Sequence, residues 1–399
     1  MEKKKVYIIG AGISGLSAAH YLNKAGFTDI EIFESSPYAG GRCRSYFDDT
    51  LAMELDNGNH LILQANENIF GLLNELGTKE RFNEFNDPVF NFYNNLTGEK
   101  YSFKPPFPYI KRYGIKESLI FYWFLFIGQD RTVYKAFKRS PKIFSEIINP
   151  ISRSILNTDS QTASSVILRN VFLKIMRSGK SGFNYLYPKK SWGDALIEPL
   201  VTSLQKSGVK INFSQGIKGF EFKNDQVTKI LFSKDSIDIG NSKIILAVPA
   251  IAAGKMAGVT APEKFEQIYN IHFKFEHDLK PQIHGIINAP VEWFFIKEGI
   301  VSTTFSAASK LENMDDEAIV KTTWEIFCKI FGVTAELPQY RILREKRASF
   351  SCEKNELAKR PEAKTKYKNL FLCGDYIENG LPATIEGAVM NGRNLAGLI

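Results

Sequence analysis

Short apolar runs alternate with amphipathic stretches along most of this chain of 399 residues. Apolar or alternating runs predict strands at residues 6–9, 30–33, 209–213, 217–222, 229–232, 243–249 and 369–373. Apolar positions at helical spacing predict one helix that starts near residue 13 and another that ends near residue 77. They also predict helices over 164–178, 192–206 and the stretch after 380. Strands that alternate with helices in this way indicate the α/β class.

The composition and the periodicity of the sequence change along the chain, and these changes divide it into five segments. Residues 1–77, 188–255 and 360–399 carry the strand and helix pattern of a nucleotide-binding domain. Residues 78–187 are helical and rich in aromatic residues, whereas residues 256–359 mix strands and helices. We therefore predict a Rossmann-like domain of three layers, interleaved with a mixed α+β domain that binds the substrate.

The first predicted strand leads into a glycine-rich turn made of Gly10, Ala11, Gly12, Ile13, Ser14 and Gly15. Gly10 permits the tight turn, Gly12 lets the backbone approach a pyrophosphate, and Gly15 lets the helix pack closely on the strand. The pyrophosphate would lie on the free N–H groups where the helix begins. This spacing after a strand predicts a dinucleotide site.

A second group of residues makes FAD the predicted dinucleotide. Glu34 closes the run 30–33, with Ser35 beside it, and is placed to accept hydrogen bonds from an adenosine ribose. A carboxylate there disfavours the 2′-phosphate of NADP. A second close backbone approach and two cations for the diphosphate and the flavin end come from Gly40, Gly41, Arg42 and Arg44. One GxGxxG motif stands out, so the electrons are expected from the substrate or from a separate electron donor.

The carboxy-terminal segment supplies the other end of the same site. A predicted strand runs into Gly374 and Asp375, and a helix starts after Pro382, Ala383 and Thr384. The N–H groups of that helix start are expected at the flavin O2 edge, and Asp375 at the ribityl hydroxyls.

Charge and hydropathy leave the surface chemistry open. The net charge is +8, but basic and acidic residues are interspersed and carry no nucleic-acid-binding signature, so no nucleic-acid partner is expected. A solvated basic surface and attraction to an anionic membrane remain the two interpretations. Residues 118–127 form an apolar run about half as long as the roughly 20 residues that span a bilayer. That run is a core helix, an interfacial anchor, or the mouth of a pocket for a hydrophobic ligand.

Cysteine usage points to a reducing compartment. The four cysteines lie far apart without metal-ligand spacing, so neither a disulfide framework nor a metal site is expected. The basic residues Lys3, Lys4 and Lys5 run directly into a strand, without the apolar stretch of a signal peptide. We expect a cytoplasmic protein, with contact to the inner face of the cytoplasmic membrane left open.

These motifs together resemble the FAD-dependent amine oxidase and phytoene desaturase superfamily, and within it the hydroxysqualene dehydroxylase family of bacterial hopanoid biosynthesis. The narrower likenesses are the runs at residues 56–61, 345–350 and 380–387. The resemblance implies that reduced FAD converts hydroxysqualene, a long hydrophobic isoprenoid, to squalene, water and oxidised FAD. It also implies cofactor contacts at Asn59, His60, Ile217 and Pro249.

His60 is the candidate proton donor for the departing hydroxide, because its loop passes near the flavin ring in this superfamily. The alternative is that His60 only hydrogen-bonds the loop backbone. We expect Asp56 to organise the loop by accepting backbone N–H groups.

Three other functions stay open at this point: a carotenoid-type desaturase, an amine oxidase, and a flavin-stabilised isoprenoid carrier without catalysis. The aromatic stretch 101–127 favours a long hydrocarbon over a small amine.

Overall fold

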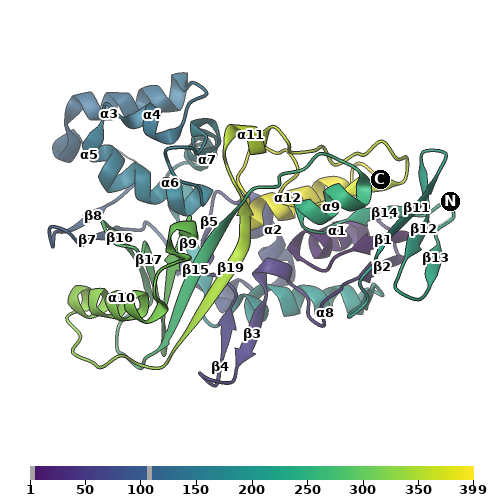
Figure 1. Cartoon of the computed structure of the whole chain (residues 1–399), viewed down its shortest axis with the longest axis horizontal. Coiled ribbons are helices and arrows are strands. Elements are labelled where there is room, and N and C mark those ends of the chain that lie inside the picture. The colour runs from purple at the N-terminus through teal and green to yellow at the C-terminus, as the bar shows by residue number, and fades with distance from the viewer. Residues whose placement is uncertain (1–4, 106–109) are drawn as a thin grey trace.

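A parallel sheet of five strands forms the centre of one half of the molecule (Figure 1). The computed structural model describes residues 5–105 and 110–399, and the sheet has the strand order β10–β2–β1–β14–β20. These strands are β1 (Val6–Ile9), β2 (Ile30–Phe33), β10 (Lys210–Asn212), β14 (Lys243–Leu246) and β20 (Leu370–Leu372), and neighbours are parallel. Three segments that lie far apart in the sequence therefore meet in one sheet.

Alternate residues of the central strands contact two different layers. On β1, Val6 and Ile8 pack against helices, whereas Tyr7 and Ile9 pack against the opposite layer. The helical layer holds α1 (Ile13–Lys24), α2 (Glu67–Leu76), α8 (Glu198–Lys206) and α12 (Ile385–Leu395). The opposite layer holds α9 (Ala250–Ala257) and the meander of β11 (Gly219–Lys223), β12 (Gln226–Leu231) and β13 (Ser236–Asp238). Because both faces are covered, the residues of β1 and β20 and the last three residues of β14 are all apolar or aromatic. The predicted three-layer Rossmann-like fold is confirmed.

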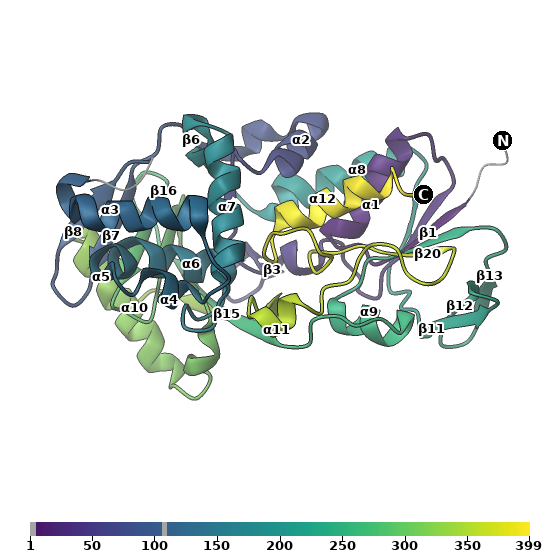
Figure 2. The same ribbon diagram turned by 90° about the horizontal axis from the view of Figure 1, so that it is seen from above.

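A mixed sheet of seven strands forms the other half, at the far end of the molecule from both termini (Figures 1 and 2). Its order is β19–β15–β18–β17–β16–β7–β8. The strands are β7 (Phe90–Asn94), β8 (Lys100–Phe103), β15 (Phe265–Lys274), β16 (Gln282–Ile287), β17 (Trp293–Lys297), β18 (Ile300–Phe305) and β19 (Tyr340–Phe350). Helix α10 (Asp316–Phe331) packs on one face through Trp324 and Phe327. The opposite face is turned toward α6 (Asn149–Leu156) and α7 (Ser165–Arg177).

Smaller elements surround these two sheets. The outer helices are α3 (Ile110–Ile127), α4 (Val133–Phe137) and α5 (Pro141–Ile143), and α11 (Lys354–Leu357) follows β19. On α3, Phe121 and Phe124 contact Phe172 of α7. The strands β3 (Ser45–Asp48) and β4 (Met53–Asp56) form a hairpin, and β5 (Ile62–Leu63), β9 (Tyr185–Pro188) and β6 (Phe82–Phe85) form a small sheet.

One expectation about the elements holds only in part. Helices are expected to dominate the segment 78–187, and α3 to α7 do so, but the segment begins with the strands β6, β7 and β8. Polar Asn91 alternates with Phe90 and Phe92, which is the period of a strand, and a turn follows. The aromatic composition concealed this period. The helix expected over 164–178 is confirmed as α7, and the strand expected over 243–249 stops at Leu246. The domain boundaries stay predictions.

Two glycines bring α1 close to its neighbours. A Cβ atom at Gly15 would lie 2.0 Å from the carbonyl oxygen of Gly10, so only glycine lets α1 start against the turn. A Cβ atom at Gly392 of α12 would lie 2.8 Å from the backbone nitrogen of Ala18 in α1. The direct packing of α1 on α12 therefore depends on a missing side chain.

The substitution Gly392→Ala is expected to lower the free energy of unfolding by about 1–3 kcal/mol, because the added methyl overpacks this contact. Gly71 of α2 offers a matched control, since a Cβ atom there meets nothing within 4 Å. Gly71→Ala should keep or raise stability, because alanine favours helix more than glycine does. Urea unfolding of both variants measures the difference. Unchanged stability of the Gly392 variant would contradict the close packing.

Candidate active site

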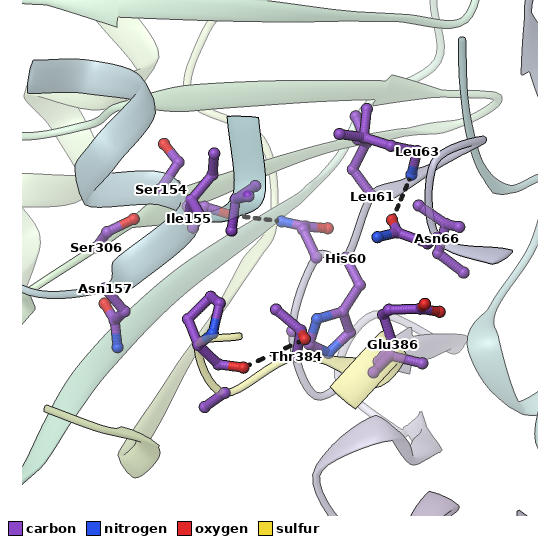
Figure 3. A pocket seen from close by; sticks show the side chains of 18 of the residues that line it. His60, Leu61, Leu63, Asn66, Ser154, Ile155, Asn157, Ser306, Thr384 and Glu386 are labelled. Carbon is purple, nitrogen blue, oxygen red and sulfur yellow. Dashed lines mark hydrogen bonds between the residues drawn. The ribbon is translucent and has the colours of Figure 1, made fainter. Parts of the chain in front are cut away.

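A cavity of about 350 Å³ lies where the two halves of the molecule meet. One side is formed by the loop after β4 and the start of α12, and the other by β15–β18, α6 and α7. In Figure 3, Ser154, Ile155 and Asn157 lie on one side of the cavity, and His60, Thr384 and Glu386 lie on another. The cavity thus joins residues of both halves.

The part of the cavity between α6, α7 and the seven-stranded sheet is mainly apolar. Its walls are Phe90, Phe103, Ile151, Ile155, Val171, Phe172, Ile175, Phe183, Ile268, Ile283, Trp293 and Phe295. The few polar groups there already have protein partners: Asn157 donates to the Ser349 hydroxyl (2.9 Å) and accepts from the Ala307 N–H (2.7 Å). Ser154 accepts a hydrogen bond from the indole of Trp293. This part of the cavity therefore offers a ligand mainly hydrocarbon contacts.

The part of the cavity lined by the loop after β4 carries polar atoms without such partners. Among the described residues, Nε2 of His60 and Oδ1 of Asn59 are buried and have no hydrogen-bond partner. His60 also packs its ring edge-to-face against Trp192, with centroids 5.9 Å apart. Burial lowers the pKa of His60 to about 4, and the charges of Arg42 and Lys297 act in the same direction against Asp56. The imidazole is therefore neutral at neutral pH.

An ion pair joins two predicted cofactor residues at this polar side. The Nη2 atom of Arg42 donates to Oδ1 of Asp375 over 2.7 Å, and Nη1 donates to the carbonyl of Ala348 over 2.8 Å. Asp375 is buried at the turn after β20, whereas Arg42 is half-buried and lines the cavity. The guanidinium is thus held by both halves and keeps one side turned to the cavity.

A second ion pair, which is buried, fixes the loop of residues 56–60. Oδ2 of Asp56 lies 3.1 Å from Nζ of Lys297, and both residues are no more than 6% exposed. Oδ1 of Asp56 accepts from the Ser45 hydroxyl and from the N–H of Trp192, each at 2.7 Å. Asp56 therefore organises the loop as expected, but through partners outside it.

The same loop is tied to the seven-stranded sheet by amides. Nδ2 of Asn57 donates to Oε2 of Glu345 on β19 (3.1 Å), and Nδ2 of Asn59 donates to the carbonyl of Thr303 on β18 (3.1 Å). These contacts set where His60 lies along the cavity wall.

The backbone around the glycine turn fits a pyrophosphate. Gly10 has φ +108°, and a Cβ atom there would lie 2.4 Å from the carbonyl of Ala247. Gly40 donates its N–H to the carbonyl of Ala11 (2.8 Å), so the second glycine pair packs on the first turn. No side chain caps the start of α1 at Gly12, and its first turn holds no acidic residue. The first N–H groups of α1 therefore face an open, positively polarised end.

Apart from Arg44, the predicted cofactor residues fall into two groups. Those that line the cavity are Arg42, Asn59, His60, Pro382, Ala383 and Thr384. Those at or beyond the carboxyl ends of the parallel strands are Gly10, Ala11, Gly12, Ile13, Ser14, Gly15, Glu34, Ser35, Ile217, Pro249, Gly374 and Asp375, with Gly40 and Gly41 packed beside them. Arg44 is exposed and does not line the cavity.

Glu34 holds the glycine turn through its carboxylate. Its carboxylate accepts hydrogen bonds from the N–H groups of Ala11 and Ser36, both at 2.7 Å. The ribose contact stays a prediction.

Sequence reasoning missed Lys297, Trp192 and Ala348 as parts of this site. Lys297 ends a strand whose other four residues are apolar or aromatic. A charged residue in such a strand is the one local signal that it pairs with a buried residue of opposite charge. Trp192 and Ala348 give no local signal, because the contacts that make them relevant lie far away in the sequence.

Comparison with known proteins identifies the family of this chain. The family model described as flavin containing amine oxidoreductase matches residues 13–399. The hydroxysqualene dehydroxylase of Sinorhizobium fredii is 30% identical over 99% of this chain and 98% of its own length. That of Zymomonas mobilis is 29% identical over 98% of both chains. The chain belongs to the hydroxysqualene dehydroxylase family. It is therefore an FAD-dependent oxidoreductase within the flavin containing amine oxidoreductases.

Solved structures support the fold. An oxidoreductase from Methanosarcina mazei matches with a TM-score of 0.75 and 16% identity, covering 98% of this chain and 99% of that chain. Cyclohexylamine oxidase from Brevibacterium oxydans matches with a TM-score of 0.73 and 14% identity, covering 99% and 98%. These likenesses show that the dehydroxylase family chain has the amine oxidase architecture.

Replacing Lys297 by Met is expected to destabilise this dehydroxylase family protein by roughly 3–5 kcal/mol, because it leaves the buried Asp56 carboxylate without its cation. The double variant Asp56→Asn, Lys297→Met removes both charges, while the amide oxygen can still accept from Ser45 and Trp192. It should therefore be more stable than the Lys297→Met variant. Urea unfolding of the parent, both single variants and the double variant measures the coupling. A double variant that is no more stable than the Lys297→Met variant would contradict this account.

Proposed function

We propose that this protein catalyses the reductive dehydroxylation of hydroxysqualene to squalene, with FAD as the cofactor and a separate donor that reduces it. The observation that carries the proposal is the distribution of polarity in the cavity. Unpaired polar atoms of Asn59 and His60 lie on the loop after β4, which forms one part of the cavity lining, and hydrocarbon walls from α6, α7, β16 and β17 form another part. A long isoprenoid with one hydroxyl group has the same distribution of polarity.

The residues present fit FAD. The open start of α1 and the packed glycines would hold the pyrophosphate, and Arg42, Asp375 and the start of α12 would hold the flavin end. When bound and reduced, FAD supplies a hydride to the allylic carbon that loses its hydroxyl group. With one proton for the hydroxide, the products are squalene, water and oxidised FAD.

The chain itself has two tasks in this reaction. The aromatic and aliphatic walls, among them Trp293, Phe295 and Phe172, exclude water and hold the hydrocarbon chain in one orientation. His60 is proposed as the residue that donates the proton to the departing hydroxide, since it lines the polar side of the cavity.

An anaerobic single-turnover experiment tests the reaction. The FAD-loaded protein is photoreduced and mixed with hydroxysqualene, and flavin reoxidation is followed by absorbance while squalene is measured by mass spectrometry. Squalene is expected to form in step with reoxidation and in equal amount. Reduced flavin that persists beside intact hydroxysqualene would contradict the proposal, and oxidised enzyme with a phytoene-like polyene would then be the next trial.

The proton-donor role of His60 predicts how the rate depends on pH. Because the pKa of His60 is about 4, the protonated fraction rises about tenfold for each pH unit between 7 and 5. The single-turnover rate of the parent should rise in the same direction. His60→Gln, compared at equal FAD content, should be slower by roughly 100-fold or more at pH 5 and flat with pH. A parent rate that does not change with pH would leave His60 a merely structural part of the loop.

A further inference from the structure

Helix α3 presents an apolar face to solvent. From residue 115 onward its outward row is Ile115, Leu119, Trp123, Phe126 and Ile127, which are 66%, 60%, 36%, 66% and 60% exposed. The opposite face is buried through Ser118, Phe121, Phe124 and Leu125. Helical spacing separates the two sets by about half a turn. Large apolar side chains in a contiguous exposed row indicate a surface that contacts something else.

The sequence of this helix and of the residues that follow it is strongly basic. Residues 111–142 hold eight Lys or Arg and two acidic residues, which gives a net charge of +6, compared with +8 for all 399 residues. Lys116, Lys135, Lys138 and Arg139 are exposed. An exposed apolar row flanked by cations has the composition of a helix that lies in the interface of an anionic bilayer.

The position of α3 relates this face to the cavity. Its buried face packs on α7 through Phe121, Phe124 and Phe172, and Phe172 also lines the cavity. Figures 1 and 2 place α3 at the end of the molecule that is far from both termini. The outward row is therefore separated from the apolar walls by one layer of helices.

We propose that the outward face of α3 docks the protein on an anionic lipid bilayer. No helix within residues 5–105 and 110–399 is long and apolar enough to cross a membrane. The proposed contact is that of a helix lying in the interfacial plane. The charge around α3 favours a lipid surface over a second copy of this chain, because two copies would bring their cations together. The docked face would also bring the cavity near a substrate dissolved in the bilayer. This part of the inference rests on the proposed function.

Tryptophan fluorescence gives a direct measurement. Of the four tryptophans, Trp192, Trp293 and Trp324 are no more than 9% exposed, whereas Trp123 is on the outward face. FAD-loaded protein is mixed with vesicles of phosphatidylcholine containing about one third phosphatidylglycerol, without substrate or reductant. The emission should shift to the blue, brominated lipids should quench it, and both signals should be absent in Trp123→Phe. Pure phosphatidylcholine or added salt should weaken binding.

A matched pair of variants tests the face itself. The double variant Leu119→Asp, Phe126→Asp should bind the anionic vesicles at least about tenfold more weakly in flotation. Phe47→Asp changes an equally exposed residue (65%) on the β3–β4 hairpin and should bind as the parent does. Circular dichroism and FAD content confirm that each variant is folded.

Three results would overturn the proposal. They are no binding to either vesicle, equal binding by the double variant, and a lipid-free dimer that the double variant dissociates. Because binding is measured without turnover, it is separate from the reaction. A protein that binds vesicles but makes no squalene would leave the docking surface standing and remove the proposed function.

Discussion

The buried ion pair of Asp56 and Lys297 is the contact on which the arrangement of the cavity depends. Asp56 ends the β4 strand in the half built on the five-stranded sheet, here called the cofactor half. Lys297 ends the β17 strand in the seven-stranded sheet. Burying two charges costs free energy unless their remaining hydrogen bonds are made. Here Ser45, Trp192 and the carbonyl of Lys190 make them. The pair therefore fixes how the loop that carries His60 meets the apolar walls.

The polarity of the cavity follows from where its walls come from. The cofactor half contributes turns and a helix start, whose backbone groups and side chains are polar and are only partly used within the protein. The other half contributes one face of a sheet and two helices, and a face that packs against helices must be apolar. A ligand at this junction meets polar groups at one end and hydrocarbon along the rest.

The sequence predicts the local parts of this arrangement well. Local structure depends on neighbouring residues, so it can be recognised in the sequence. This holds for glycines with positive φ, such as Gly10 and Gly40, and for apolar strand runs. The strands β7 and β8 were missed because their aromatic composition looked helical, although their period is that of strands. Lys297 and Trp192 were missed for another reason, since their roles arise from contacts more than 100 residues away.

The central claim is that one cavity holds the flavin end at its polar side and a long hydrocarbon at its apolar side. A crystal structure of the FAD-loaded protein with squalene tests it most directly. The account predicts hydrocarbon density between α7 and β17, against Phe172 and Trp293, with one end beside His60. Squalene bound outside this cavity, or a flavin ring lying away from Arg42 and Thr384, would contradict it.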